Sequence, residues 1–275
     1  MADNQDTPPS DSAPRPPALT PATVRTPSPA AEPGISAESH DIIILHLIYG
    51  MLTGWIPVPI VDGLAADYLR RRMVYQLAAG HGEKLSSEQV HILTEERGSC
   101  LGCVGGCLFA LISIPFRLVT LLARALQVLR IKRFVESAGR AYHTARLIEY
   151  ALRTKKLHPA GAPAALRVRA AMDRVVATTN TTPVNKALLS ILQGNKDMLR
   201  TAAAYFNRAL RALPFRKRDA DHVGDALQQA EAQTATSVGG IVWPLRSALD
   251  AIPPQHFTEM EAALDAELAR DDKPL

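Results

Sequence analysis

Three cysteines lie close together in one apolar stretch of the chain, and they are its only cysteines. Cys100, Cys103 and Cys107 give the spacing C-x2-C-x3-C, and His91 lies upstream as a candidate fourth ligand. A structural zinc site normally takes two pairs of ligands from separate turns, and an iron–sulfur cluster takes four thiolates. Three thiols along one apolar helix fit neither pattern well, so a metal or redox site is the less favoured interpretation.

Helix packing is the favoured role for this stretch. A buried free cysteine behaves as a small apolar residue, and small residues let a second helix approach closely. The chain therefore needs no metal or cofactor here. The predicted small-residue face consists of Gly102, Cys103, Gly106 and Cys107.

Motifs for catalysis are missing from the sequence. There is no G-x-x-x-x-G-K-[ST] phosphate loop, no G-x-G-x-x-G, no H-E-x-x-H and no G-x-S-x-G. The tetrapeptide GNKD at 194–197 is superficially similar to a guanine-specificity motif, but no phosphate loop accompanies it. We expect no catalytic residues and a protein that is not an enzyme. An enzyme with an unrecognised site is the weaker alternative.

Two long segments, 42–61 and 99–116, carry no charge. A membrane-spanning helix needs about 20 apolar residues, and the second segment is at the lower limit of that length. Pro57, Pro59 and Pro115 interrupt a helix, because proline removes a backbone donor and clashes with the preceding turn. We expect re-entrant or interfacial hairpins that enter and leave a membrane on the same side. Burial of both segments in the core of a soluble bundle is the alternative.

A long basic amphipathic helix is predicted directly after the second segment, over residues 117–154. Between Arg117 and Lys156 the only acidic residues are Glu136 and Glu149. Each Lys or Arg near an anionic membrane surface adds about 1 kcal/mol of binding. Nucleic-acid binding is not expected, because aromatic residues do not interleave the basic ones. An ordinary solvated helix face is the alternative. The residues expected at the lipid surface are Trp55, Phe109, Phe116, Arg117, Arg124, Arg130, Lys132, Arg133 and Arg140.

Composition predicts an all-α protein, because alanine, leucine and arginine dominate and all three favour helices. The predicted architecture is a helical bundle with apolar hairpin-like segments, the long basic helix and a disordered N-terminal arm. The arm is the Pro/Ala/Ser-rich segment 1–40, which cannot bury enough apolar surface to order itself. A membrane-associated helical domain over 41–156 and a C-terminal helical region over 157–275 follow. Further helices are expected at 62–79, 164–178, 183–213 with a bend at Gly194, 219–236 and 254–270. A short helix is expected to begin at a capping box of Ser86 and Gln89 and to end near Gly98.

Residues 54–93 carry a pattern that resembles a known family. An apolar helix is followed by I-P-x-P-x-x-D, and then by a helix with a basic-Met-x-x-x-Leu-Ala core and a glycine. This pattern is similar to that of the YcjF-like bacterial domain of uncharacterised function, found in inner-membrane and GTPase-associated proteins. The resemblance implies an α-helical, membrane-associated module without known catalysis, with a GTPase in another chain as a partner. Asp62 is expected to cap the helix that follows it. The matching residues are Ile56, Pro57, Pro59, Asp62, Arg72, Met73, Leu77, Ala78 and Gly82.

These observations favour a non-catalytic, membrane-associated helical module that binds a lipid surface or a protein partner. The first ten residues lack the basic and apolar regions of a secretory signal, and the clustered cysteines do not make a disulfide framework. We therefore expect the cytoplasmic face of the bacterial inner membrane. The alternatives are a soluble helical interaction bundle with both apolar stretches in its core and, less favoured, a metal or redox protein. The oligomeric state stays open.

Overall fold

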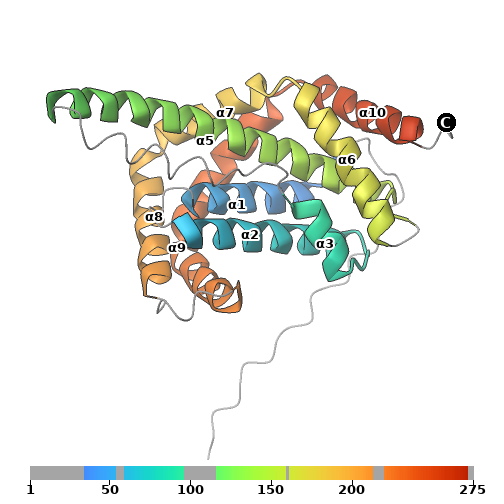
Figure 1. The fold of residues 1–275 in the computed structure, drawn as a ribbon, viewed down its shortest axis with the longest axis horizontal. Coiled ribbons are helices and arrows are strands. Elements are labelled where there is room, and N and C mark those ends of the chain that lie inside the picture. The colour runs from blue at the N-terminus through green and yellow to red at the C-terminus, as the bar shows by residue number, and fades with distance from the viewer. Residues whose placement is uncertain (1–33, 54–58, 96–115, 159–160, 213–219, 272–275) are drawn as a thin grey trace, which may run out of the picture. The chain divides into compact units, whose positions relative to one another are not determined.

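The computed structural model describes residues 34–53, 59–95, 116–158, 161–212 and 220–271 of the chain (Figure 1). Within these ranges every regular element is an α-helix and no strand occurs, so the predicted all-α class is confirmed. Contacts divide the chain into residues 1–34 and 35–275. The predictions for the first 33 residues and for the cysteine stretch lie outside the described residues.

The helices are labelled as in Figure 1. They are α1 (Ala37–Thr53), α2 (Pro59–Gly80), α3 (Ser87–Thr94), α5 (Phe116–Arg153), α6 (Ala162–Thr178), α7 (Thr182–Gly194), α8 (Lys196–Arg211), α9 (Ala220–Asp250) and α10 (Pro254–Asp271).

Helix α1 lies at the centre of the core. It contacts α2, α5, α8 and α9, and Figure 1 shows it running between α2 and α5. Ile44 and Ile48 are completely buried, and Tyr49 packs against Phe206 of α8 with ring centroids 5.5 Å apart. A helix that is apolar on all sides needs an apolar environment on all sides. For residues 42–53 the surrounding helices supply that environment.

The start of α1 corrects the predicted N-terminal arm, which extends too far. Residues 37–40 form the first turn of α1, and His40 is buried. The Ser36 hydroxyl accepts a hydrogen bond from the backbone N–H of Ser39 at 3.0 Å, which caps the helix. A polar sequence with one good N-cap therefore starts the helix before the apolar run begins.

The boundaries of α2 and α3 also differ from the predictions. Helix α2 starts at Pro59, so Asp62 lies within its first turn instead of capping it. Proline is tolerated there because the first N–H groups of a helix have no partner inside it. The capping box of α3 is confirmed, with Ser86 and Gln89 bonding to each other's backbone N–H at 3.2 and 2.9 Å. Helix α3 ends at Thr94, not near residue 98.

The C-terminal helices follow the predicted apolar stripes more closely than the predicted ends. The predicted bend near Gly194 is a break at Asn195, which separates α7 from α8. Helix α9 continues to Asp250 instead of ending near residue 236, and Pro244 lies inside it. The buried face of α9 continues past the adjacent Gly239 and Gly240. Tertiary packing therefore extends the helix beyond what local helix propensity predicts. That face is formed by Val238, Ile241, Leu245 and Leu249.

Helices of the predicted domain 41–156 pack against helices of the predicted C-terminal region 157–275, within the unit 35–275. Helix α3 contacts α6, and α2 contacts α9. The α2–α9 crossing depends on Gly224, where an added Cβ would lie 2.6 Å from a ring carbon of Tyr68. The hydroxyl of Tyr68 accepts a hydrogen bond from the side-chain amide of Gln228 at 2.8 Å. Glycine therefore lets the two helices approach closely at this point.

Candidate functional site

A buried polar network runs along the second half of α5, and it is the first candidate for chemistry. Tyr142, Arg146, Glu149 and Arg153 recur every three or four residues, so they share one face of the helix. They are joined by His143 on the adjoining face. Helices α1, α9 and α10 and the turn after α2 supply the partners of this network.

The first part of the network is an Asp–His–Tyr chain. His40 Nε2 lies 3.0 Å from the Tyr142 hydroxyl, and His40 Nδ1 lies 3.4 Å from a carboxylate oxygen of Asp250. Burial lowers the pKa of His40 to about 4, while the charge of Asp250 raises it and those of Arg146 and Arg246 lower it. Burial also raises the pKa of Tyr142. The imidazole is therefore neutral and the phenol protonated near neutral pH.

Catalysis by this chain is disfavoured by those same pKa shifts. A tyrosine nucleophile must lose its proton, and burial makes that loss harder for Tyr142. A general base needs a pKa near the working pH, and that of His40 is about 4. Both side chains are almost completely enclosed. The arrangement therefore fixes the start of α1 against α5 and α9.

The second part of the network is a pair of histidines. His143 is fully buried, and its Nδ1 lies 2.7 Å from the carbonyl oxygen of Gly139. Since only a protonated Nδ1 can donate to that carbonyl, His143 Nε2 carries the lone pair. His256 Nε2, 3.0 Å away, is then the donor. Burial lowers the pKa of both rings, so the pair is neutral and joins α5 to α10.

The third part is a cluster of charges between α5, α10 and α2. The Arg146 guanidinium stacks over the ring of Phe257 at 4.5 Å and lies 3.8 Å from Glu261. Glu149, which is fully buried, lies 3.4 Å from Arg153 and 3.3 Å from His81. Burial raises the pKa of Glu149, whereas the neighbouring Arg153, His81 and Arg146 lower it. Opposite charges therefore lie next to one another inside the bundle.

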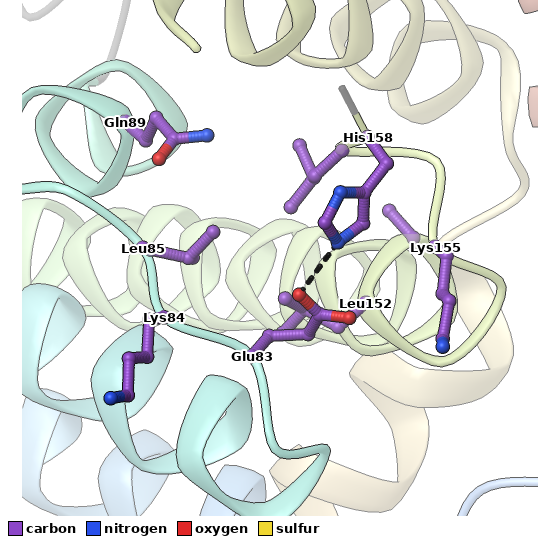
Figure 2. A pocket seen from close by; sticks show the side chains of 9 residues that line it. Glu83, Lys84, Leu85, Gln89, Leu152, Lys155 and His158 are labelled. Carbon is purple, nitrogen blue, oxygen red and sulfur yellow. Dashed lines mark hydrogen bonds and ion pairs between the residues drawn. The ribbon is translucent and has the colours of Figure 1, made fainter. Parts of the chain in front are cut away.

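A small pocket between the start of α3 and the end of α5 is the second candidate. Figure 2 shows the His158 imidazole pointing at the Glu83 carboxylate, 2.8 Å away, while Lys84 and Lys155 point away from it. The cavity measures about 20 Å³, which is room for a single water molecule. Its side chains are already engaged with each other, so it offers no space for a substrate.

The predicted functional residues fall into three groups. Trp55, Ile56, Pro57 and Phe109, with the small-residue face of Gly102, Cys103, Gly106 and Cys107, lie outside the described residues. Phe116, Arg117, Arg124, Arg130 and Arg133 belong to α5, but their side chains also lie outside the described part. The third group lies in the described part of the chain. Lys132 and Arg140 are exposed on α5, and Pro59 and Asp62 are in the first turn of α2. Arg72 pairs with Glu231 at 2.5 Å, and Met73 is buried.

Metal binding and membrane crossing can be examined only where the structure describes the chain. Among those residues no group of three or more His, Cys, Asp or Glu side chains is placed to hold a metal ion. His91, the candidate fourth ligand, has its Nδ1 3.2 Å from the Arg71 guanidinium, which donates to it. None of the helices in the described ranges combines the length and the apolar character needed to cross a bilayer.

Comparison of the chain with protein families, curated proteins and solved structures finds no match. The resemblance to the YcjF-like domain over residues 54–93 therefore stays a prediction. What the geometry defines is a class: an α-helical bundle with a buried network of histidine, tyrosine, arginine and glutamate side chains.

The surface shows what the sequence interpretation missed. Trp243 of α9 is 74% exposed, and Tyr205 and Met198 of α8 are 39% and 36% exposed. The signal for Trp243 is present in the sequence, since it lies near the end of an uncharged run over 232–245 that includes two adjacent glycines. Buried His40 gives no comparable signal, because it lies in a polar stretch that precedes the apolar run.

Proposed function

We propose that this protein is a non-catalytic helical module that binds an anionic membrane surface through the N-terminal half of α5 and the uncharged residues 99–116 before it. The burial of α1 supports this placement of the lipid contact, because the other uncharged segment packs among helices over residues 42–53. The cytoplasmic face of the bacterial inner membrane, expected from the sequence, is the proposed location.

The position of α5 is the observation that carries the proposal. Figure 1 shows the first turns of α5 extending past α7 and α8, directly after the second uncharged segment. Leucines alternate there with Arg117, Arg124 and Arg130 in an amphipathic pattern. A basic amphipathic helix lies in the plane of a membrane interface, where its binding grows with the buried apolar area and with attraction to anionic lipid.

Flotation with lipid vesicles tests the proposal. The full chain is mixed with vesicles of phosphatidylcholine and phosphatidylglycerol, and in parallel with pure phosphatidylcholine. We expect flotation with the anionic vesicles that weakens as the salt concentration rises. The double variant Arg124→Ala/Arg130→Ala loses two charges near the surface, or about 2 kcal/mol, which is about 30-fold in partitioning.

A matched double variant controls for the change in net charge. Lys84→Ala/Arg270→Ala removes the same two charges from exposed positions on other parts of the bundle, and it is expected to float like the wild type. Failure of the wild-type chain to float with anionic vesicles at low salt refutes the proposal.

The second candidate is a helical protein-interaction bundle that makes no lipid contact. The burial of α1 favours it equally, since a bundle that covers its own apolar helix needs no bilayer for that segment. The YcjF-like resemblance suggests a GTPase as the partner. A chain that stays monodisperse without detergent and does not float with either kind of vesicle supports this candidate.

A further inference from the structure

An exposed apolar patch joins α8 and α9, and we name it the Trp243 patch after its most exposed member; the others are Met198 and Tyr205. Met198 lies against the surface of α9, because a Cβ added at Gly240 would meet its sulfur at 3.4 Å. Gly240 precedes Trp243 by one helical turn, and Tyr205 follows Met198 by two turns on the same face of α8. The three side chains therefore belong to one surface.

Exposed basic residues lie on α8, one of the two helices that carry the Trp243 patch. Lys196, Arg200 and Arg208 are exposed on α8, whose one acidic residue, Asp197, lies 3.9 Å from Arg200. Lys196 and Arg208 form no ion pair with any residue that the structure describes. Arg208 follows Tyr205 by about one helical turn, so a basic side chain lies at the edge of the patch, and α8 as a whole carries an excess of positive charge.

The surface of α8 is also hollowed beside Arg208. A shallow depression that is open to solvent is lined by Ala204, Asn207, Arg208 and Ala212. The two alanines leave space next to the guanidinium, and the Asn207 amide adds polar hydrogen-bonding atoms. The Arg208 guanidinium suits a lipid phosphate, because guanidinium groups bind phosphate oxygens in pairs.

We infer that the Trp243 patch is a second lipid-contacting surface, whose occupant is the headgroup layer of an anionic bilayer. Tryptophan and tyrosine concentrate at membrane interfaces, where the ring is partly in the apolar region and its polar atom stays hydrated. Lys and Arg beside them attract anionic headgroups. Figure 1 places α8, which carries Met198 and Tyr205, at the end of the bundle past which the first turns of α5 extend. The inference rests on the proposed function and adds a second contact to it.

The fluorescence of Trp243 tests the inference directly. The chain has two tryptophans, so Trp55→Phe leaves Trp243 as the single emitter. On mixing with vesicles of phosphatidylcholine and phosphatidylglycerol we expect a blue shift of its emission and protection from acrylamide quenching. Vesicles of phosphatidylcholine alone are expected to give a much smaller shift, because they carry no net charge to attract the Lys and Arg side chains of α8.

Flotation of a second variant makes the test independent of Trp55→Phe. The double variant Trp243→Ser/Tyr205→Ser is expected to partition about tenfold more weakly than the wild type, because two side chains no longer leave water. Tyr75→Ser/Leu166→Ser removes two exposed apolar side chains, 44% and 45% exposed, from α2 and α6 and serves as the control. Thermal unfolding of all variants checks that the bundle is intact.

The outcomes separate this inference from the proposed function. If the wild type floats and Arg124→Ala/Arg130→Ala weakens it, while Trp243 emission and the Trp243→Ser/Tyr205→Ser variant are unchanged, only the second surface is refuted. A blue shift that appears without vesicles as the protein concentration rises assigns the patch to a second copy of the chain and also refutes it. An equal shift with neutral vesicles refutes the role of the Lys and Arg side chains. Loss of all flotation overturns both proposals.

Discussion

His46 offers a sharp test of how the buried polar groups affect stability. This residue is in the middle of α1 and is only 6% exposed. Burial lowers its pKa to about 4; the hydrogen bond between its Nδ1 and the carbonyl of Ile42 opposes that shift, and the charge of Arg72 adds to it. Replacing it by leucine removes the titrating ring while keeping an apolar side chain of similar size.

The size of the effect follows from the two pKa values. Since the folded pKa of His46 lies below the unfolded value of 6.5, the unfolded chain binds the proton more readily. Its contribution to stability is complete above the unfolded pKa and is lost as the pH falls toward about 4. At about pH 5 the loss amounts to about 2 kcal/mol of unfolding free energy. His40, with the same lowered pKa, contributes a loss of similar size.

Two buried carboxyl groups act in the opposite direction. Burial raises the pKa of both Glu149 and Glu231, so their contribution to stability is present at low pH and is lost as the pH rises through the folded pKa. They offset part of the histidine effect in the wild type. Because His46→Leu leaves both carboxyl groups in place, the difference between variant and wild type isolates the imidazole.

The assay is urea unfolding followed by circular dichroism at about pH 7.5 and about pH 5. The drop in unfolding free energy between these two values is expected to be smaller by about 2 kcal/mol in His46→Leu than in the wild type. His91→Leu, on the exposed surface of α3, controls for the loss of one histidine from the unfolded chain. An equal drop in His46→Leu and wild type refutes the claim that burial keeps this imidazole neutral.

Two further predictions concern single contacts. Gly224→Ala brings a methyl group against the Tyr68 ring and is expected to lower the unfolding free energy by about 1–2 kcal/mol. Gly50→Ala adds a methyl group where nothing lies within 4 Å and is expected to raise the unfolding free energy by up to about 1 kcal/mol. Thermal unfolding of both variants compares the two effects. Ser86→Ala breaks the capping box of α3 and is expected to cost about 1 kcal/mol in a urea titration, whereas an unchanged midpoint would show that packing alone holds α3.

The apolar stripes of the amphipathic helices were predictable, because each has one face to bury. Ala65, Leu69, Met73 and Leu77 recur every four residues, and all four are buried in α2. The stripe that begins at Val184 likewise continues through the break at Asn195 into α8, down to buried Leu210. Periodicity identifies a face that leaves water. It does not identify what covers that face.

Helix α1 shows where that limitation matters most. An uncharged run suits a lipid environment and the centre of a bundle equally well, since both bring apolar atoms to every face. The choice depends on whether distant segments supply a cover, and for α1 two of them, α8 and α9, begin more than a hundred residues later. No local pattern in residues 42–53 carries that information.

The buried polar network was beyond sequence reasoning for a related reason. His40, His143 and His256 are isolated in the sequence, and each finds its partner on another helix or in the backbone. Their environment makes them neutral, and neutral imidazoles can be buried at a modest cost when both ring nitrogens have partners. A histidine in a polar stretch, such as His40, therefore becomes a core residue only because Tyr142 and Asp250 meet it there. The same dependence on distant partners explains why this interior holds helices together.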